Sequence, residues 1–300
     1  MFEILTQNIL PVFSILVLGF LLGRKGYVSN TEATTLNRVA FLILQPALIF
    51  PLVVRAQFNE FHFEAIALYG LAQAIIFLIS FCIGFFIFAC SAIESWLIAM
   101  ASIFVNSLLY ILPITQLIYG AHGNLPITAV VVWDATFTFA FFIITTDLLA
   151  NNKVSFSQTI LRLARNPVLL TIFLGLCVNT SGILTPEPLF IALDFVGASA
   201  APLTLFALGV ILSSHGMSLT PKITVFTIIK LFGLPLLVFA LLQYGRHPNL
   251  WSNMLLLNSA GPSGAMAFAL ALLYKTKTDT IAPVIIWTSV LSLFSLAWLA

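Results

Sequence analysis

The chain has 300 residues, of which 61% are hydrophobic and 7% are charged, and its formal net charge is +2 at pH 7. Charged residues make up roughly a quarter of a typical soluble domain, so this composition excludes a water-soluble globular fold and indicates a protein that folds in lipid. The small net charge gives no indication of nucleic-acid binding, and the three scattered cysteines and four histidines lack the spacing of a metal site.

Continuously apolar stretches of about 20 residues recur along the chain, which is the length that a helix needs to cross a bilayer. They lack the period-two alternation of membrane barrel strands, so we expect an all-α integral membrane protein. The sequence predicts ten transmembrane helices, over residues 4–23, 33–54, 64–89, 95–119, 125–149, 166–182, 188–213, 221–244, 250–274 and 279–299.

The basic residues between the predicted spans fall mainly on one side of the membrane. If the N-terminus lies outside, Arg55 and Arg246 face outward, and the other side carries Arg24, Lys25, Arg38, Lys153, Arg162, Arg165, Lys222, Lys275 and Lys277. An excess of lysine and arginine marks the cytoplasmic side. We therefore expect a multi-pass protein of the cell (inner or plasma) membrane with both termini outside.

The chain matches itself at an offset of 156 residues. This offset aligns identical proline and glycine residues, namely Pro11 with Pro167, Gly19 with Gly175, Gly26 with Gly182 and Pro46 with Pro202. These residue types fix backbone geometry, so their coincidence carries more weight than apolar matches do. We expect a first five-helix repeat over 1–150, a cytoplasmic linker over 151–165 and a second repeat over 166–300. Because five is odd, the second repeat is predicted to be inverted.

The predicted fourth and ninth spans each contain an asparagine followed by a proline near the middle. Breaks at corresponding positions of two repeats indicate the binding site of a transporter. Amide groups exposed at the start of the second half-helix, near Ser263 in the ninth span, attract anions, and glycine lets a ligand approach the main chain. The alternative is that the prolines only kink their helices and the asparagines only join neighbours. The predicted substrate-binding residues are Asn106, Pro113, Asn258, Ser259, Gly261, Pro262 and Ser263.

Two ionisable residues lie deep in predicted spans, Asp134 in the fifth and Lys230 in the eighth. Charges inside a membrane are costly unless they are paired or hydrated, and they often mark function. One hypothesis is that the two residues pair and respond to substrate or proton, in a coupling or gating role. The alternative is a structural ion pair, or an aspartate that only contacts Thr136 and Thr138. Gln45 either borders the substrate path or caps a proline kink.

Several segments resemble the auxin efflux carrier family of membrane transporters. The most specific is VGASAAPLTLFALG, at residues 196–209, and further matches are LNRVAF (36–41), QPALIF (45–50), Asn166-Pro167, KLFGLPL (230–236) and the region around Pro262. The resemblance implies ten spans in two inverted halves, with spans one, two, six and seven as a scaffold. The other spans would form a transport domain in which the broken spans four and nine cross.

The family carries small organic anions, with malonate and malate among the substrates of bacterial members and auxin among those of plant members. One departure concerns the fourth span, where the family usually has glycines between the asparagine and the proline. Leu108 and Ile111 stand at those places here. The resemblance therefore leaves the substrate less defined than the fold.

The leading hypothesis is a secondary carrier of small organic anions such as malonate, malate or other carboxylates, working by alternating access. It requires no cofactor, with H+ or Na+ as candidate coupling ions, and its partners are the anion and the lipid bilayer. The small-xxx-small spacing of Gly19 and Gly23 also allows a homodimer. One alternative is a sodium-coupled symporter of the bile-acid-transporter type, which needs free carbonyls around a cation near the crossing. Another is a non-transporting receptor or scaffold. No catalytic motif is found, so we do not expect an enzyme.

Overall fold

The computed structural model describes residues 2–120, 124–150, 160–161 and 163–300. Most of the predicted linker over 151–165, with Lys153 and Arg162, lies outside these described residues. Within them the chain forms helices and no strand. The prediction of an all-α protein is therefore confirmed for the described part of the chain.

Among the described residues, seven helical segments are long and apolar enough to cross a membrane. They are Phe2–Arg24, Asn30–Val54, Phe63–Ile87, Asn124–Ala150, Glu187–Ser213, Pro221–Leu242 and Ile281–Leu299. Each coincides with one of the ten predicted spans. The sixth predicted span is a shorter helix, α11 (Pro167–Ser181), and the fourth and ninth are each divided into two helical pieces.

Four prolines inside helical segments follow a wider, π-helical turn. The turns Leu5–Ile9, Ala40–Leu44, Ser107–Ile111 and Ile229–Gly233 each end two residues before a proline, at Pro11, Pro46, Pro113 and Pro235 respectively. Proline has no N–H group and its ring clashes with the carbonyl four residues earlier. A π-helical turn, in which hydrogen bonds reach five residues back, changes the position of that carbonyl. We infer that the helices continue past these prolines for this reason.

The chain divides into two compact units. Unit 1 consists of Met1–Phe13, His62–Lys153 and His215–Ala300, and unit 2 consists of Ser14–Phe61 and Val154–Ser214. This division follows the one that the family resemblance implies, with predicted spans one, two, six and seven in unit 2. The difference is that the beginning of the first span, up to Phe13, belongs to unit 1.

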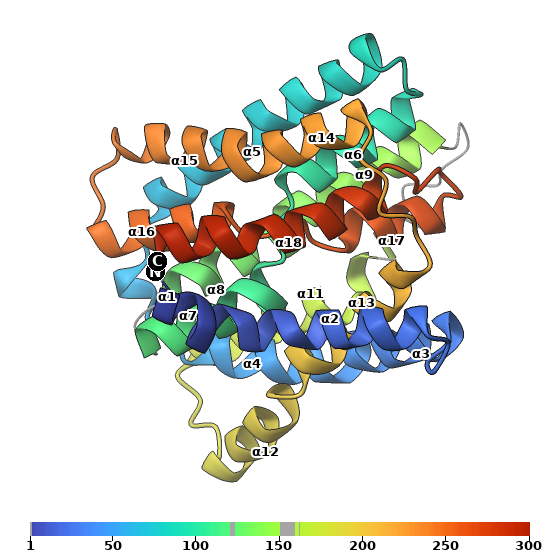
Figure 1. Ribbon diagram of the computed structural model, residues 1–300. Coiled ribbons are helices and arrows are strands. Elements are labelled where there is room, and N and C mark those ends of the chain that lie inside the picture. The colour runs from blue at the N-terminus through green and yellow to red at the C-terminus, as the bar shows by residue number, and fades with distance from the viewer. Residues whose placement is uncertain (1, 121–123, 151–159, 162) are drawn as a thin grey trace. The chain divides into compact units, whose positions relative to one another are not determined.

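Among the described residues of unit 2, the main helices are α2 (Leu10–Arg24), α3 (Asn30–Val39), α4 (Gln45–Val54), α11, α12 (Glu187–Gly197) and α13 (Ala200–Ser213), with the first residues of α2 counted in unit 1. Helices α11 and α12 pack on α4, and α13 packs on α3 (Figure 1). Ser29 and Glu32 form a reciprocal capping box that starts α3.

The two glycines of the small-xxx-small pattern lie against α13 of the same unit. A Cβ atom at Gly19 would lie 2.1 Å from the carbonyl oxygen of Phe206, and one at Gly23 would lie 2.4 Å from Oγ of Ser213. Because this face of α2 is covered within the chain, the glycine pattern gives no support to a homodimer.

The offset of 156 residues recurs in contacts of unit 2. Gly19 lies against the carbonyl group of Phe206, and Gly175 lies against that of Phe50, with its Cβ position 3.6 Å from the oxygen. Both the glycines and the phenylalanines are separated by 156 positions. Gly26 and Gly182, another aligned pair, both have left-handed backbones just after a helix, with φ of 76° and 66°. The repeat of whole helices stays a prediction.

Unit 1 is built around α18 (Ile281–Leu299), the most buried of the seven long helical segments. It packs against α6 (Ala92–Ile103), α14 (Pro221–Ile228), α16 (Asn249–Ser259) and α17 (Met266–Leu273). The N-terminal turn Leu5–Ile9 also packs on α18, so the two ends of the chain lie side by side (Figure 1). Helix α5 (Phe63–Cys82) packs on α6 and on α15 (Leu234–Leu242), and α8 (Asn124–Trp133) packs on α16.

Candidate functional site: a crossing of two broken helices

Two helices of unit 1 are interrupted, and the interruptions pair with each other. Helix α6 ends at Ile103 and the next helical turn begins at Ser107, while α16 ends at Ser259 and α17 begins at Met266. The amide of Asn106 donates to the carbonyl of Pro262 at 3.1 Å, and the amide of Gly264 donates to the carbonyl of Phe104 at 2.8 Å. The two short extended segments therefore run antiparallel and hold the four half-helix ends together.

The sequence led us to expect that the predicted fourth span is broken at Pro113. The structure places the break elsewhere. It lies at residues 104–106, and Pro113 falls inside the second half-helix, at the start of α7 (Leu112–Tyr119). The π-helical turn before Pro113 accommodates the ring, so the proline does not open the main chain. In the ninth span Pro262 does lie in the break, although the second half-helix begins at Met266 rather than near Ser263.

The two asparagines keep unused hydrogen-bonding capacity at the crossing. Asn258 is fully buried and donates through Nδ2 to the hydroxyl of Tyr69 at 2.9 Å, but its Oδ1 atom has no partner. The half-buried side chain of Asn106 makes no hydrogen bond to any described residue, and the buried hydroxyl of Ser107 has no partner among them either. Buried polar atoms without partners are rare in proteins, so Asn258 Oδ1 and Ser107 Oγ are candidates for contact with a ligand or water, and the half-buried amide of Asn106 lies beside Ser107 in the chain.

The two serines predicted to donate to an anion have their hydroxyl groups engaged within the protein. Ser259 Oγ donates to the carbonyl of Leu256 at 2.6 Å, and Ser263 Oγ donates to that of Ala101 at 2.7 Å. The amide of Ser263 also donates, to Oγ1 of Thr288 at 3.1 Å. Ser263 therefore ties the break to α6 and α18, whereas the Ser259 hydroxyl is bonded within α16, and neither hydroxyl is a free donor in this conformation.

Gly261 does not leave an open approach to the main chain. A Cβ atom there would lie 2.5 Å from Cδ1 of Ile111, and one at Gly264 would lie 2.9 Å from Cδ1 of Phe104. The glycines therefore let bulky side chains of the opposite break pack against the backbone. Ile111 is one of the residues that stand where the family usually has glycine, so this contact follows from that departure.

Asp134 and Lys230 are both buried but do not form the direct pair that we considered. Asp134 Oδ1 accepts hydrogen bonds from Gln73 at 2.8 Å and from Thr138 at 3.1 Å, and its Oδ2 atom has no partner. Lys230 Nζ donates to the carbonyls of Ser259 at 2.8 Å and Gly261 at 2.9 Å. The contact of Asp134 with Thr138 agrees with the alternative reading, whereas Thr136 bonds to the carbonyl of Val132.

Both charged residues lie in π-helical turns, at Asp134–Thr138 and Ile229–Gly233. Such turns inside α-helices occur frequently at functional sites. Gln45, by contrast, is the buried first residue of α4 and belongs to unit 2. The structure therefore brings together the predicted residues of spans four, eight and nine in unit 1, and Gln45 is not among them.

A comparison with known families decides where the chain belongs. A family model described as "Membrane transport protein", which represents the auxin efflux carrier family, matches residues 4–299. The chain belongs to this family. It is a multi-pass membrane protein with several apolar helices, as its composition predicts.

Two relatives of this auxin efflux carrier family member match along almost their whole length. A protein of Rhizobium meliloti named "Putative malonate transporter" is 24% identical over 299 residues, which cover 96% of this chain and 92% of the relative. A protein of Methanothermobacter thermautotrophicus named "Uncharacterized transporter" is 25% identical over 299 residues, covering 97% of this chain and 96% of the relative.

Three polar residues of the site were missed by the sequence analysis. On α5, Tyr69 accepts a hydrogen bond from Asn258, and Gln73 donates one to Asp134. On α18, the hydroxyl of Thr288 accepts a hydrogen bond from the amide of Ser263. Gln73 carries the one amide side chain of the predicted span 64–89, which is a signal that could have been read. Nothing local distinguishes Tyr69 or Thr288 from other residues of apolar helices, since their roles come from tertiary contacts.

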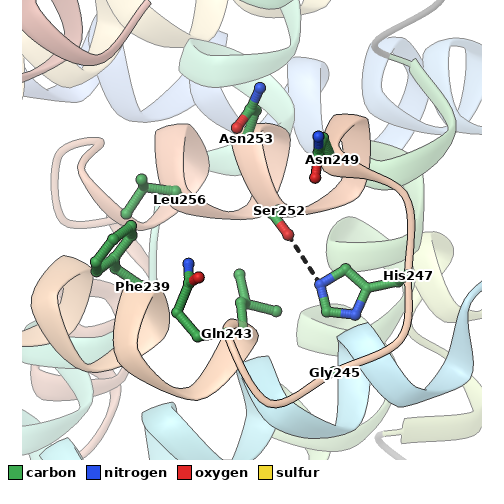
Figure 2. A pocket seen from close by; sticks show the side chains of 9 residues that line it. Phe239, Gln243, Gly245, His247, Asn249, Ser252, Asn253 and Leu256 are labelled. Carbon is green, nitrogen blue, oxygen red and sulfur yellow. Dashed lines mark hydrogen bonds between the residues drawn. The ribbon is translucent and has the colours of Figure 1, made fainter.

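A separate surface hollow lies between α15 and α16, with a volume of about 290 Å³ (Figure 2). Its polar lining includes Gln243, Asn249 and Asn253, and the ring of His247 shares a hydrogen bond of 2.9 Å between Nε2 and Oγ of Ser252. Partial burial lowers the pKa of His247 below its usual value of 6.5, although the charge of Glu64 opposes this shift. The hollow contains none of the residues that we predicted to bind substrate.

Proposed function

We propose that this protein is a secondary carrier of small organic anions, with dicarboxylates such as malonate as the first candidates. The anion would bind at the crossing in unit 1 and reach each side of the membrane in turn by alternating access. Asn106 and Asn258 would provide hydrogen bonds, with Pro113 and Pro262 setting the course of the backbone around them. The relative named for malonate supports this choice of substrate class.

The observation that carries the proposal is the presence of two uncapped helix starts at one crossing. The helical segment from Ser107 and the helix from Met266 both begin there, and neither receives a side-chain cap from the preceding residue, Asn106 or Ala265. The first amides of a helix have no intrahelical partner and carry the positive end of its dipole. Two such ends at a membrane helix break are suited to bind a carboxylate.

The wider architecture belongs to the same proposal. We propose ten spans arranged as two inverted five-helix repeats, over 1–150 and 166–300, joined by a cytoplasmic linker, with both termini outside the plasma membrane. The recurrence of the 156-residue offset in the contacts of Gly19 with Phe206 and of Gly175 with Phe50 supports this arrangement. Unit 2 would be the scaffold and unit 1 the moving transport domain.

The substrate class is tested by uptake into proteoliposomes under an imposed pH gradient, with labelled malonate and malate. We expect saturable uptake of at least one acid that is inhibited by unlabelled malonate but not by malonamide, which has the same skeleton without negative charge. A carboxylate gains charge-assisted hydrogen bonds, about 1.5–3 kcal/mol each, that the neutral diamide does not. Equal inhibition by malonamide would contradict an anion site. Lack of uptake of every acid by folded protein would favour the receptor or scaffold alternative.

A further inference from the structure

The ammonium group of Lys230 is held in a site made of main-chain carbonyls. Lys230 is fully buried, and Nζ donates to the carbonyl oxygens of Ser259 at 2.8 Å and Gly261 at 2.9 Å. Ser259 is the last residue of α16 and Gly261 lies in the break that follows. Both oxygens belong to the C-terminal end of a half-helix, where the helix dipole is negative.

Carbonyl oxygens at such an end attract cations. In transporters with broken helices, unwound carbonyls and the C-terminal ends of half-helices coordinate Na+ or protons. In this chain the positive charge at that place is covalently attached to the η8 turn (Ile229–Gly233) of the eighth predicted span. Since the ammonium already lies at hydrogen-bonding distance from both oxygens, a metal cation and Lys230 would compete for the same two ligands.

The other break has no equivalent charge among the described residues. At the end of α6 the carbonyl of Ala101 accepts from Oγ of Ser263, and that of Phe104 accepts from the amide of Gly264. These donors are neutral. The predicted third span, 64–89, which has the place of the eighth span in the first repeat, contains no lysine or arginine. The cation is therefore a feature of the α16 end alone.

The carboxylate of Asp134 is not in contact with Lys230. Asp134 is bound by Gln73 and Thr138, and the two charges interact only at longer range. The ammonium is therefore positioned by the carbonyls rather than by an ion pair. A direct ion pair with Asp134 could have stabilised the buried lysine without the carbonyls of the break. Since no such pair forms, the carbonyls are the groups that bind Lys230.

We propose that the Lys230 ammonium is a built-in cation, which fills a carbonyl site that would otherwise take a monovalent cation such as Na+ from solution. The consequence for transport is that binding of the anion at the crossing would be independent of Na+. This consequence rests on the proposed function. This separates the carrier from a sodium-coupled symporter of similar fold, which leaves such carbonyls free for the ion.

The test compares melting temperatures of the purified protein in detergent, in NaCl and in the chloride of the bulky cation N-methylglucamine. The wild type is expected to melt at the same temperature in both salts. Lys230→Ala vacates the site and is expected to melt several degrees higher in NaCl than in N-methylglucamine chloride. Lys222→Ala is the matched control. Lys222 lies away from the break, and its Nζ forms an ion pair of 3.0 Å with Oε1 of Glu94. This variant is expected to melt alike in the two salts.

Two results would overturn the inference. One is a wild-type protein that is stabilised by NaCl over N-methylglucamine chloride, and this arm needs no variant to fold. The other is a folded Lys230→Ala protein that responds to the salts as the wild type does. If Lys230→Ala does not fold, Lys230→Met takes its place, because methionine fills much of the space of lysine and has no donor for the two carbonyls, and the same outcomes apply. Because melting requires no transport, a protein with the expected salt response but no anion uptake would retain this inference and lose the proposed function.

Discussion

Replacing Gly209 with alanine is expected to remove most of the folded protein. A Cβ atom at this position in α13 would lie 2.1 Å from the carbonyl oxygen of Leu16 and 2.8 Å from the amide nitrogen of Phe20. Overpacking against side chains costs about 1–3 kcal/mol. Here the neighbouring atoms are backbone of α2, which cannot rotate away as a side chain can. We therefore expect a loss at or above the upper end of that range.

The measurement is the yield of monodisperse protein in detergent, together with its melting temperature. Gly216→Ala is the matched control, because Gly216 is exposed and a Cβ atom there meets nothing within 4 Å. Its yield and melting temperature are expected to equal those of the wild type. A Gly209→Ala protein with unchanged yield and melting temperature would show that α2 and α13 do not approach as closely as described.

Gly261→Ala is expected to reduce both stability and uptake, because it acts on the crossing itself. The new methyl group would lie 2.5 Å from Cδ1 and 2.9 Å from Cγ1 of Ile111, which is fully buried. The isoleucine must therefore leave its rotamer or displace the break whose carbonyls bind Lys230. Unlike the contact at Gly209, this one involves the end of a side chain, so we expect a folded protein with an impaired site.

A double variant separates this contact from a general effect at the break. Ile111→Ala alone leaves a cavity and is expected to cost about 2–5 kcal/mol. In the double variant the methyl group at position 261 enters the space that Ile111 vacates. The double variant should therefore be more stable than the sum of the single effects, by about 0.5–3 kcal/mol. Strict additivity in the melting data would contradict direct packing of Ile111 on Gly261.

Much of the architecture could be predicted because lipid imposes a simple pattern on the sequence. Long apolar stretches gave the helical ranges, and Asn106 and Asn258 marked the two interrupted helices. The predicted position of the first break was wrong. A π-helical turn accommodates Pro113, and the helix is interrupted at residues 104–106 instead. A proline in a sequence indicates a disturbed hydrogen bond, but not whether a wider turn absorbs it.

The partners of the buried polar groups were harder to predict. Asp134 and Lys230 are the obvious pair by charge, yet the aspartate binds Gln73 and the lysine binds main-chain carbonyls. Every residue has a main-chain carbonyl group, so the sequence does not indicate which carbonyl accepts a hydrogen bond from a lysine. Helix ends become visible as sites only when the path of the chain is known.

The most direct test of the anion site at the crossing is the initial rate of labelled malonate uptake by Asn106→Ala in proteoliposomes. Loss of a hydrogen bond to a charged group is expected to cost about 1.5–3 kcal/mol, which lowers the uptake rate per unit of substrate roughly tenfold to a hundredfold. Asn249→Ala, which removes an exposed amide from the surface hollow, is the control and should leave the rate unchanged. Saturable uptake that survives Asn106→Ala unaltered would contradict binding at the crossing.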